Sequence, residues 1–223
     1  MFDNKERKLE RMSSGLPDTL SPGAYNAVML LTLLYGFAVN ALMVTALADR
    51  LAGLSPGVFN IGYFISSLAG TILAASDKPA LSFAGYNLIV LPIGVLLCLA
   101  LPGYGTALVL EAIILTGILT AVMLVLGVLF PQIFASMGRA LGICLLVGCL
   151  LSLASWFIAG IGEFLGYAFA ILFTLYIGYD MQRAQAYPRT LDNAIDSAID
   201  LYLDVINLFL RILRILARAR RDD

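Results

Sequence analysis

The stretch AIDSAIDLYLDVINLFLRILRILARA, residues 194–219, decides the fold because it places ionisable side chains along one face of an otherwise apolar helix. At about 100° per residue, seven polar side chains fall within an arc of about 80°. They are Asp196, Asp200, Asp204, Asn207, Arg211, Arg214 and Arg218. Ionisable groups within a membrane usually face a bundle interior or a watery cavity. The stripe therefore predicts a buried polar pathway.

The composition places the rest of the chain in a lipid bilayer. Of its 223 residues, 61% are hydrophobic and 13% are charged, and the mean hydropathy is +0.92. Soluble domains carry about 25% charged residues. These values predict an all-α polytopic membrane protein. The net charge of -1 gives no support for a nucleic-acid surface.

The apolar runs predict seven helices in a single transmembrane domain, residues 21–223, because about 20 residues are needed for each span. We expect the spans at residues 25–48, 56–75, 80–101, 106–129, 140–160, 164–179 and 194–219. Residues 1–20 are polar and are expected to form a solvated arm. We expect the last helix to be central, because the other six would then shield its charged stripe from lipid.

The chain contains no histidine, which excludes Ser-His and Cys-His catalysis and histidine-ligated metals. The three cysteines lie in apolar runs and are expected to be free, buried thiols. They are Cys98, Cys144 and Cys149. We expect neither an enzyme nor a resident cofactor.

The basic residues favour a cytoplasmic N-terminus, because cytoplasmic loops carry an excess of Lys and Arg. In that orientation the basic residues at the cytoplasmic side are Lys5, Arg7, Lys8, Arg11, Lys78, Arg139, Arg183 and Arg189. Only Arg50 falls in an outside loop. The basic residues after Arg214 do not fit a seventh crossing, which would place them outside. A re-entrant or tilted last helix would keep them inside, and the sequence leaves both open.

Two aspartates are the leading site candidates. Asp180 closes the predicted sixth span and Asp204 lies on the charged stripe. A short loop connects the two helices, so the carboxylates are expected to approach one another. Two carboxylates in a desolvated site cannot both ionise cheaply, so they would share a proton and could also offer oxygen ligands to calcium. The alternative is that Asp180 caps a helix end in water and Asp204 pairs with a local Arg or Asn.

Further polar residues could extend this site into a cation path: Glu111, Asp200 and Asn207. Glu111 lies five residues into the fourth span, where a glutamate is a candidate cation ligand or a partner for a basic residue. It could equally be a helix-start glutamate that reaches the interface. Asn207 is also a candidate for a hydrogen bond between helices.

The stretch Tyr179-Asp180 followed by LYLDVINLF, residues 201–209, resembles the signature of the transmembrane Bax inhibitor motif family. Leu110-Glu111-Ala112 is similar to the family's Leu-Glu-Ala in the fourth span. The short loops look more like the bacterial branch. The resemblance implies seven helices with the last one central, and a pH-sensitive calcium leak in a cell membrane. It also implies that Asp180 and Asp204 form the pH sensor and part of the pore closure.

The resemblance has one departure at the inner end of the second span. Leak-active relatives carry arginines there, and one of them latches onto the aspartate pair. This chain has Ser76-Asp77-Lys78, so Lys78 is the basic candidate for a latch. Lysine offers a point charge without a bidentate fork. We expect any latch at Lys78 to be weaker or shifted.

Three function classes compete. The first is a pH-gated calcium leak. The second is a non-conducting regulator of membrane-protein turnover, because some bacterial relatives look like modulators of a membrane-bound AAA protease, which could grip the arm of residues 1–20. The third, an aspartyl intramembrane protease, would pair Tyr-Asp with Gly-x-Gly-Asp. Asp204 follows Leu-Tyr-Leu instead, which speaks against it.

Overall fold

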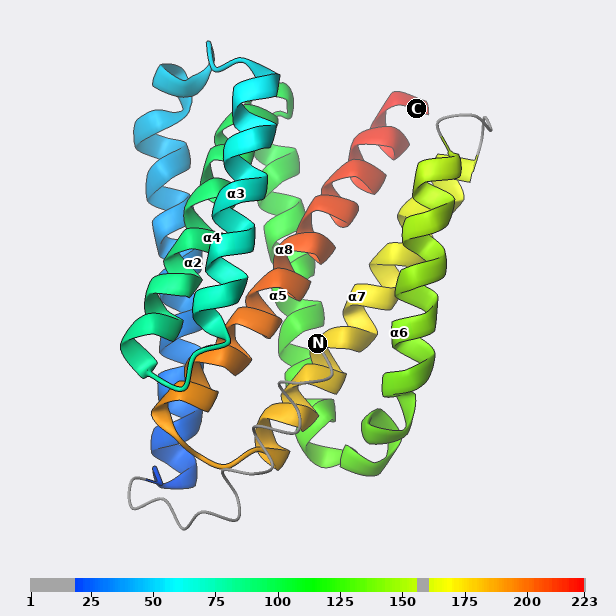
Figure 1. The fold of residues 1–223 in the computed structure, drawn as a ribbon. Coiled ribbons are helices and arrows are strands. Elements are labelled where there is room, and N and C mark those ends of the chain that lie inside the picture. Colours follow the sequence, from blue (N-terminus) through cyan, green and yellow to red (C-terminus); the bar gives the residue numbers. More distant parts are fainter. Residues whose placement is uncertain (1–18, 156–160, 223) are drawn as a thin grey trace. The chain divides into compact units, whose positions relative to one another are not determined.

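The computed structural model describes residues 19–155 and 161–222. Within these ranges the chain forms seven α-helices and one short 3-10 helix, without strands (Figure 1). The elements are α2 (Pro22–Leu51), α3 (Pro56–Ala74), α4 (Pro79–Ala100), η1 (Leu101–Gly103), α5 (Thr106–Leu129), α6 (Pro131–Ala154), α7 (Ile161–Ala186) and α8 (Leu191–Asp222). The predicted all-α class is confirmed.

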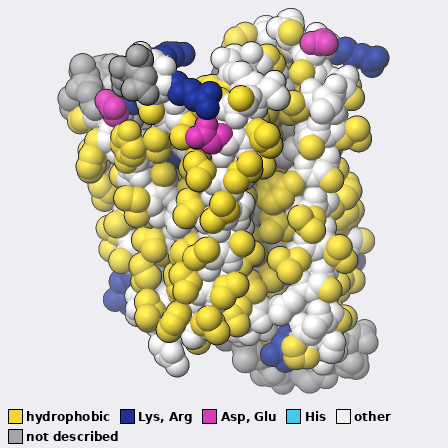
Figure 2. Space-filling model, turned by 180° about the vertical axis from the view of Figure 1, so that it is seen from behind, with side chains coloured by type: hydrophobic (Ala, Val, Ile, Leu, Met, Phe, Trp, Pro, Cys, Tyr) yellow, Lys and Arg dark blue, Asp and Glu magenta, His cyan; other side chains and the backbone are white. Residues whose placement is uncertain are grey.

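Six of the described helices, α2 to α7, are long and apolar enough to cross a membrane. On the face in Figure 2, hydrophobic side chains cover the sides of the helices, whereas acidic and basic side chains lie near helix ends. Many large apolar residues of α3, α5 and α6 are exposed. In water such a surface would be unfavourable, and a lipid environment accounts for it.

Local sequence signals explain where the helices begin. Proline occupies the first position of α2, α3, α4 and α6, where its missing N–H costs no hydrogen bond and its fixed φ suits a helix. The side chains of Ser21 and Ser55 cap α2 and α3. Each hydroxyl oxygen accepts a hydrogen bond from the backbone N–H of the third helical residue, at 3.2 and 3.3 Å.

Two predicted boundaries are wrong. The fifth span begins at Pro131 instead of Ala140, because Pro131 serves as the first residue of α6 as well as closing α5. The sixth span continues to Ala186 instead of ending at Tyr179. Arg183, expected between the sixth and seventh spans, therefore lies within α7, and Asp180 is six residues from its end. Most of the predicted N-terminal arm lies outside the described residues.

The chain divides into two compact units, each described here by itself. Unit 1 comprises α2, α3, α4, η1 and the first turns of α8, in residues up to Gly103 and in Ala186–Ile199. Unit 2 comprises α5, α6, α7 and the remainder of α8, in Tyr104–Gln185 and from Asp200 onward. The helix α8 thus contributes to both units.

In unit 1, small residues let α3 and α4 approach closely. A Cβ added to Gly70 would lie 2.8 Å from the carbonyl oxygen of Gly85, and one added to Gly85 would lie 2.6 Å from the backbone of α3. Such close backbone contact is typical of helices packed in a membrane. The hydroxyl of Tyr86 donates a hydrogen bond to the carbonyl oxygen of Thr32 at 3.0 Å and joins α4 to α2.

In unit 2, the contacts along α8 give the direction of its helices. Arg220 near the end of α8 pairs with Glu111 near the start of α5. Asp204, earlier in α8, lies beside Asp180 of α7. The neighbour Gly178 in turn packs on Gly127 at the end of α5. α8 therefore runs antiparallel to both α5 and α7.

The last helix is buried along most of its length. Every residue of Asp192–Ile199 is buried, and most of those from Leu201 to Leu213 are as well. This distinguishes α8 from α3 and α6, whose described residues are largely exposed. The polar stripe itself is buried only in part. Asp196 and Asp204 are buried, whereas the other five stripe residues are half-buried or exposed: Asp200, Asn207, Arg211, Arg214 and Arg218.

Candidate functional site

The two predicted sensor residues meet in unit 2. Asp180 of α7 and Asp204 of α8 are each only 7% exposed. Their carboxyl groups lie close enough to interact electrostatically. Asp180 lies within α7 and is buried, so it does not cap a helix end in water, whereas the role of the two aspartates as a sensor stays a prediction.

A third residue, Arg183, completes the site. Its Nη1 donates a hydrogen bond to Oδ1 of Asp180 at 2.7 Å, and its Nη2 lies 3.9 Å from Oδ2 of Asp200 on α8. The guanidinium also stands 5.4 Å from the ring centroid of Tyr179. One arginine thus links the acidic residues of α7 and α8, as its planar fork allows.

The apolar pattern of the sequence does not predict this role of Arg183, because the residue falls between the sixth and seventh predicted spans. The missing signal was the spacing. Arg183 follows Asp180 by three residues, and residues three apart are neighbours on a helix. If the sixth span is extended by two turns, Asp180 and Arg183 lie on the same face of one helix.

Glycines let the helices around Asp180 approach closely. A Cβ added to Gly178 would lie 2.3 Å from the ring of Phe134 on α6, and one added to Gly127 would lie 2.5 Å from the carbonyl oxygen of Gly178. Similarly, a Cβ on Gly138 would lie 2.5 Å from the hydroxyl of Tyr179. Three helices, α5, α6 and α7, therefore converge beside the carboxylate pair.

Of the other cation-path candidates, Glu111 lies far from this pair and Asn207 makes a hydrogen bond within its own helix. Glu111 accepts a hydrogen bond from Nη2 of Arg220 at 2.7 Å, so it has a basic partner in the structure, and its place on a cation path stays a prediction. It is sixteen residues before Gly127 on α5, about 24 Å along the helix. Asn207 donates its side-chain N–H to the carbonyl oxygen of Leu203 at 2.8 Å, a contact within α8.

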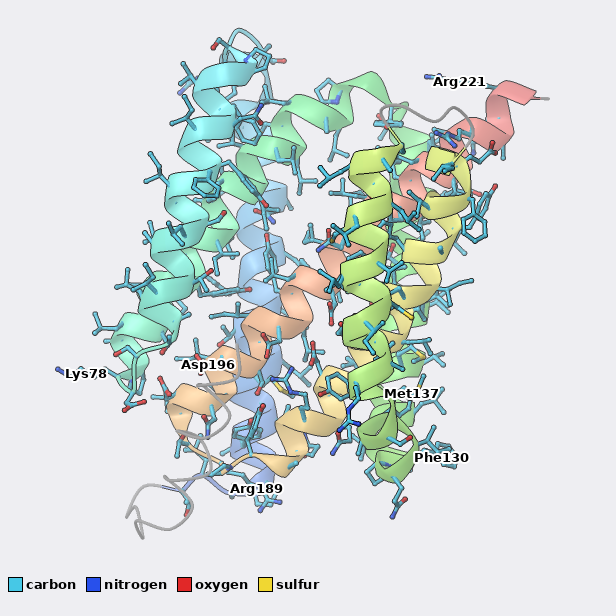
Figure 3. The ribbon with its side chains drawn as sticks, turned by 45° about the vertical axis from the view of Figure 1, so that its right-hand side comes forward. Lys78, Phe130, Met137, Arg189, Asp196 and Arg221 are labelled. Carbon is cyan, nitrogen blue, oxygen red and sulfur yellow. The ribbon has the colours of Figure 1, made fainter. Side chains whose placement is uncertain are left out.

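Lys78 belongs to unit 1. It precedes the first residue of α4, is exposed, and points outward from the turn between α3 and α4 (Figure 3). Its role as a latch for the pair stays a prediction.

In the same unit, the carboxylate of Asp192 accepts a hydrogen bond from the hydroxyl of Ser82 at 2.6 Å. Asp196, labelled in Figure 3, is buried on the next turn of α8.

A second polar contact of unit 1 holds the start of α8 to α2. The hydroxyl of Tyr25 lies 3.2 Å from the hydroxyl of Ser197 and 3.3 Å from the carbonyl oxygen of Asn193. All three residues are buried. These partners are not predictable from the sequence, because serine and tyrosine within apolar runs carry no pattern that predicts which helix they face.

Calcium would find few ligands in this arrangement. In the part of the chain that the structure describes, no group of three Asp, Glu or Cys side chains is placed to hold a metal ion. Calcium takes six to eight oxygen ligands. The pair alone would supply only part of such a shell.

Comparison with known proteins gives the family. A family model described as "Inhibitor of apoptosis-promoting Bax1" matches residues 21–222. Uncharacterized proteins of Helicobacter pylori strains 26695 and J99 are each 32% identical over 162 residues, covering 69% of this chain and 70% of the relative. Bax inhibitor 1 of Saccharomyces cerevisiae is 47% identical over 60 residues, which cover 26% of this chain and 19% of the yeast protein. The chain is a multi-pass membrane protein and belongs to the Bax inhibitor-1 family.

Proposed function

We propose that this chain is a pH-sensitive calcium leak channel whose sensor and gate is the pair Asp180–Asp204. The observation that carries the proposal is the burial of two facing carboxyl groups on different helices. Facing acids in a desolvated site share one proton, and the charge of the pair then changes when that proton leaves. Such a pair gives the chain a proton-responsive site without histidine.

Arg183 is the basic partner through which the pair acts in this proposal. When the pair loses its shared proton, its added negative charge strengthens the attraction to the guanidinium and holds α7 and α8 together. When the pair takes up a proton, that attraction weakens and the open state gains population. The shift is limited by the difference in proton affinity between the two states. Lys78 remains the alternative latch.

No hydrogen-bond partner reaches Oδ2 of Asp204 within the described residues. A buried carboxylate oxygen without a partner is costly, so this atom favours either a proton of its own or a transient cation. Both occupants are expected of a proton-gated cation path. The two cannot bind this oxygen at once, which is how protonation would oppose cation entry.

We place the chain in a bacterial cytoplasmic membrane with a cytoplasmic N-terminus. The relatives from Helicobacter pylori favour the bacterial membrane, and the basic residues favour the orientation. An uninterrupted α8 of 32 residues extends about 48 Å, longer than the hydrocarbon core of about 30 Å. Its end lies beside the start of α5, which supports a full seventh crossing over a re-entrant helix.

Calcium flux into proteoliposomes tests the proposal. The purified chain is reconstituted and flux is measured between about pH 6 and pH 8 for the wild type, Asp204→Asn and Asp192→Asn. The last variant is a matched control, because Asp192 is a buried aspartate of the same helix outside the pair. We expect flux that rises as pH falls in the wild type and in Asp192→Asn, and flux that no longer depends on pH in Asp204→Asn.

Two outcomes would contradict the proposal. Unchanged pH dependence in Asp204→Asn would remove the sensor role from the pair. No flux above empty liposomes at any pH would favour the non-conducting alternative, a regulator of a membrane-bound AAA protease or of membrane-protein turnover. Deleting residues 1–20 and measuring the turnover of membrane proteins would then be the next test.

A further inference from the structure

A second feature of unit 2 lies away from the carboxylate pair. An apolar groove with a volume of about 400 Å³ lies between α6 and α7. Residues from Met137 to Gly148 of α6 and from Leu165 to Leu175 of α7 line it, and these lining residues include no charged side chain. Cys144, which lines the groove, is exposed.

The length of the groove matches one leaflet of a bilayer. Met137 and Gly148 are eleven residues apart on α6, which corresponds to about 16 Å along the helix. The hydrocarbon core of a bilayer is about 30 Å thick, so one leaflet accounts for about half of that. The groove has the dimensions and the apolar lining that a single acyl chain requires.

Basic residues lie at one end of the groove. The guanidinium of Arg211 stands 4.6 Å from the ring centroid of Phe169, a lining residue that also contacts Gly148. Arg214 and Arg218 follow on the same stripe of α8, and both are exposed. This end is close to the start of α7, where Leu165 is the fifth residue of the helix. Figure 3 labels Met137 at the other end of the groove and Arg221 near the end of α8.

We propose that the groove holds one acyl chain of an anionic glycerophospholipid whose phosphate is bound by Arg211 and Arg214. An arginine within the hydrocarbon region is costly unless an anion accompanies it, and arginine binds phosphate with a bidentate fork. The acyl chain extends from that end toward Met137. A zwitterionic lipid fits the groove equally well, but its ammonium group offsets the attraction of the arginines.

Native mass spectrometry of the full chain tests this proposal. The protein is released from nanodiscs that contain equal amounts of phosphatidylglycerol and phosphatidylcholine, and the retained lipid is identified. We expect the wild type to retain one phosphatidylglycerol in preference to phosphatidylcholine. Arg211→Gln is expected to lower this retention about tenfold, as for the loss of one charge-assisted hydrogen bond.

Two further variants distinguish the contribution of Arg211 to lipid retention from that of the groove and from that of net charge. Arg220→Gln removes the same charge from the same helix, but Arg220 already pairs with Glu111, so retention is expected to stay at the wild-type level. Cys144→Trp fills the groove and is expected to abolish retention of both lipids. Equal retention of the two lipids by the wild type, or equal losses in Arg211→Gln and Arg220→Gln, would overturn the proposal. Full lipid retention by Cys144→Trp would overturn it too.

Discussion

Two buried aspartates of α8 have different surroundings. Asp192, in unit 1, is 3% exposed and accepts a hydrogen bond from the neutral hydroxyl of Ser82. Asp204, in unit 2, is 7% exposed and faces a second acid, Asp180. The same residue type on the same helix thus faces a neutral hydroxyl in one unit and a second acid in the other. Burial of an acid does not by itself predict function; the chemistry of its partner decides.

The largest effect, a loss of stability, is expected when a side chain is added at the close contact between α5 and α7 beside the pair. In Gly127→Val the new side chain would collide with the backbone of Gly178, since even its Cβ would lie 2.5 Å from the carbonyl oxygen. We expect a loss of about 3 kcal/mol, the upper range for overpacking, seen as a lower midpoint of thermal unfolding in detergent. Gly142→Val is the control, because no atom lies within 4 Å of a Cβ at Gly142. Equal midpoints for the two variants would contradict the close packing of α5 on α7.

The second largest effect is expected from removing Arg183, the basic partner of the pair. Arg183→Gln takes away a charge-assisted hydrogen bond to Asp180, and such bonds contribute about 1.5–3 kcal/mol. We expect calcium flux at pH 8 to rise about tenfold, toward the wild-type value at pH 6, measured in proteoliposomes. Arg139→Gln, which changes an exposed arginine of α6, is expected to leave the flux unchanged. If Arg183→Gln also leaves it unchanged, Lys78 becomes the remaining latch candidate.

A pair of alanine variants tests the comparison directly, with a smaller effect. Asp192→Ala removes the acceptor of the Ser82 hydroxyl and is expected to cost about 1–2 kcal/mol, although Ser82 also lies 3.2 Å from the carbonyl oxygen of Ser76. Asp204→Ala is expected to cost less, because one buried oxygen of Asp204 already lacks a hydrogen-bond partner among the described residues. Thermal unfolding at neutral pH measures both. A larger loss for Asp204→Ala would show that the pair is the more structural of the two sites.

The smallest effect is expected at the ion pair between Glu111 and Arg220. Both side chains are about half exposed, and solvent screens such pairs to about 0.2–1 kcal/mol. A double-mutant cycle of Glu111→Gln and Arg220→Gln is expected to give a coupling energy in this range that falls as salt is added. A coupling energy that resists high salt would mean that this end of unit 2 is sheltered from water, as the carboxylate pair is.

Much of this arrangement follows from sequence pattern. Apolar runs predicted the six spans from α2 to α7, and the stripe of acids on α8 predicted its burial. The boundaries failed at Pro131 and Asp180, because a proline and an aspartate that usually end a span also occur within or at the start of a helix. Both errors arose because a proline or an aspartate was taken to end a span, although neighbouring helices can accommodate either residue within a bundle.

The candidate site was predictable only in part. The pairing of Asp180 with Asp204 followed from a short connection and a family signature. Arg183 and the Glu111–Arg220 pair did not follow, because each depends on how far a helix continues: α7 to Ala186 and α8 to Asp222. Long-range partners such as Ser82 and Tyr25 depend on which helix faces fit together, which periodicity does not specify.

The position of Arg183 on the same helix as Asp180 has a consequence for speed. A contact between residues three apart on one helix breaks by rotation of side-chain bonds, with no helix displaced. For a side chain that is partly exposed, as Arg183 is, such rotations take picoseconds to nanoseconds. Separating Asp180 from Asp204 requires two helices to move, on a scale of microseconds to milliseconds. In the proposed leak channel, a sudden change in acidity would therefore cause a fast local rearrangement first and a movement of the helices only later.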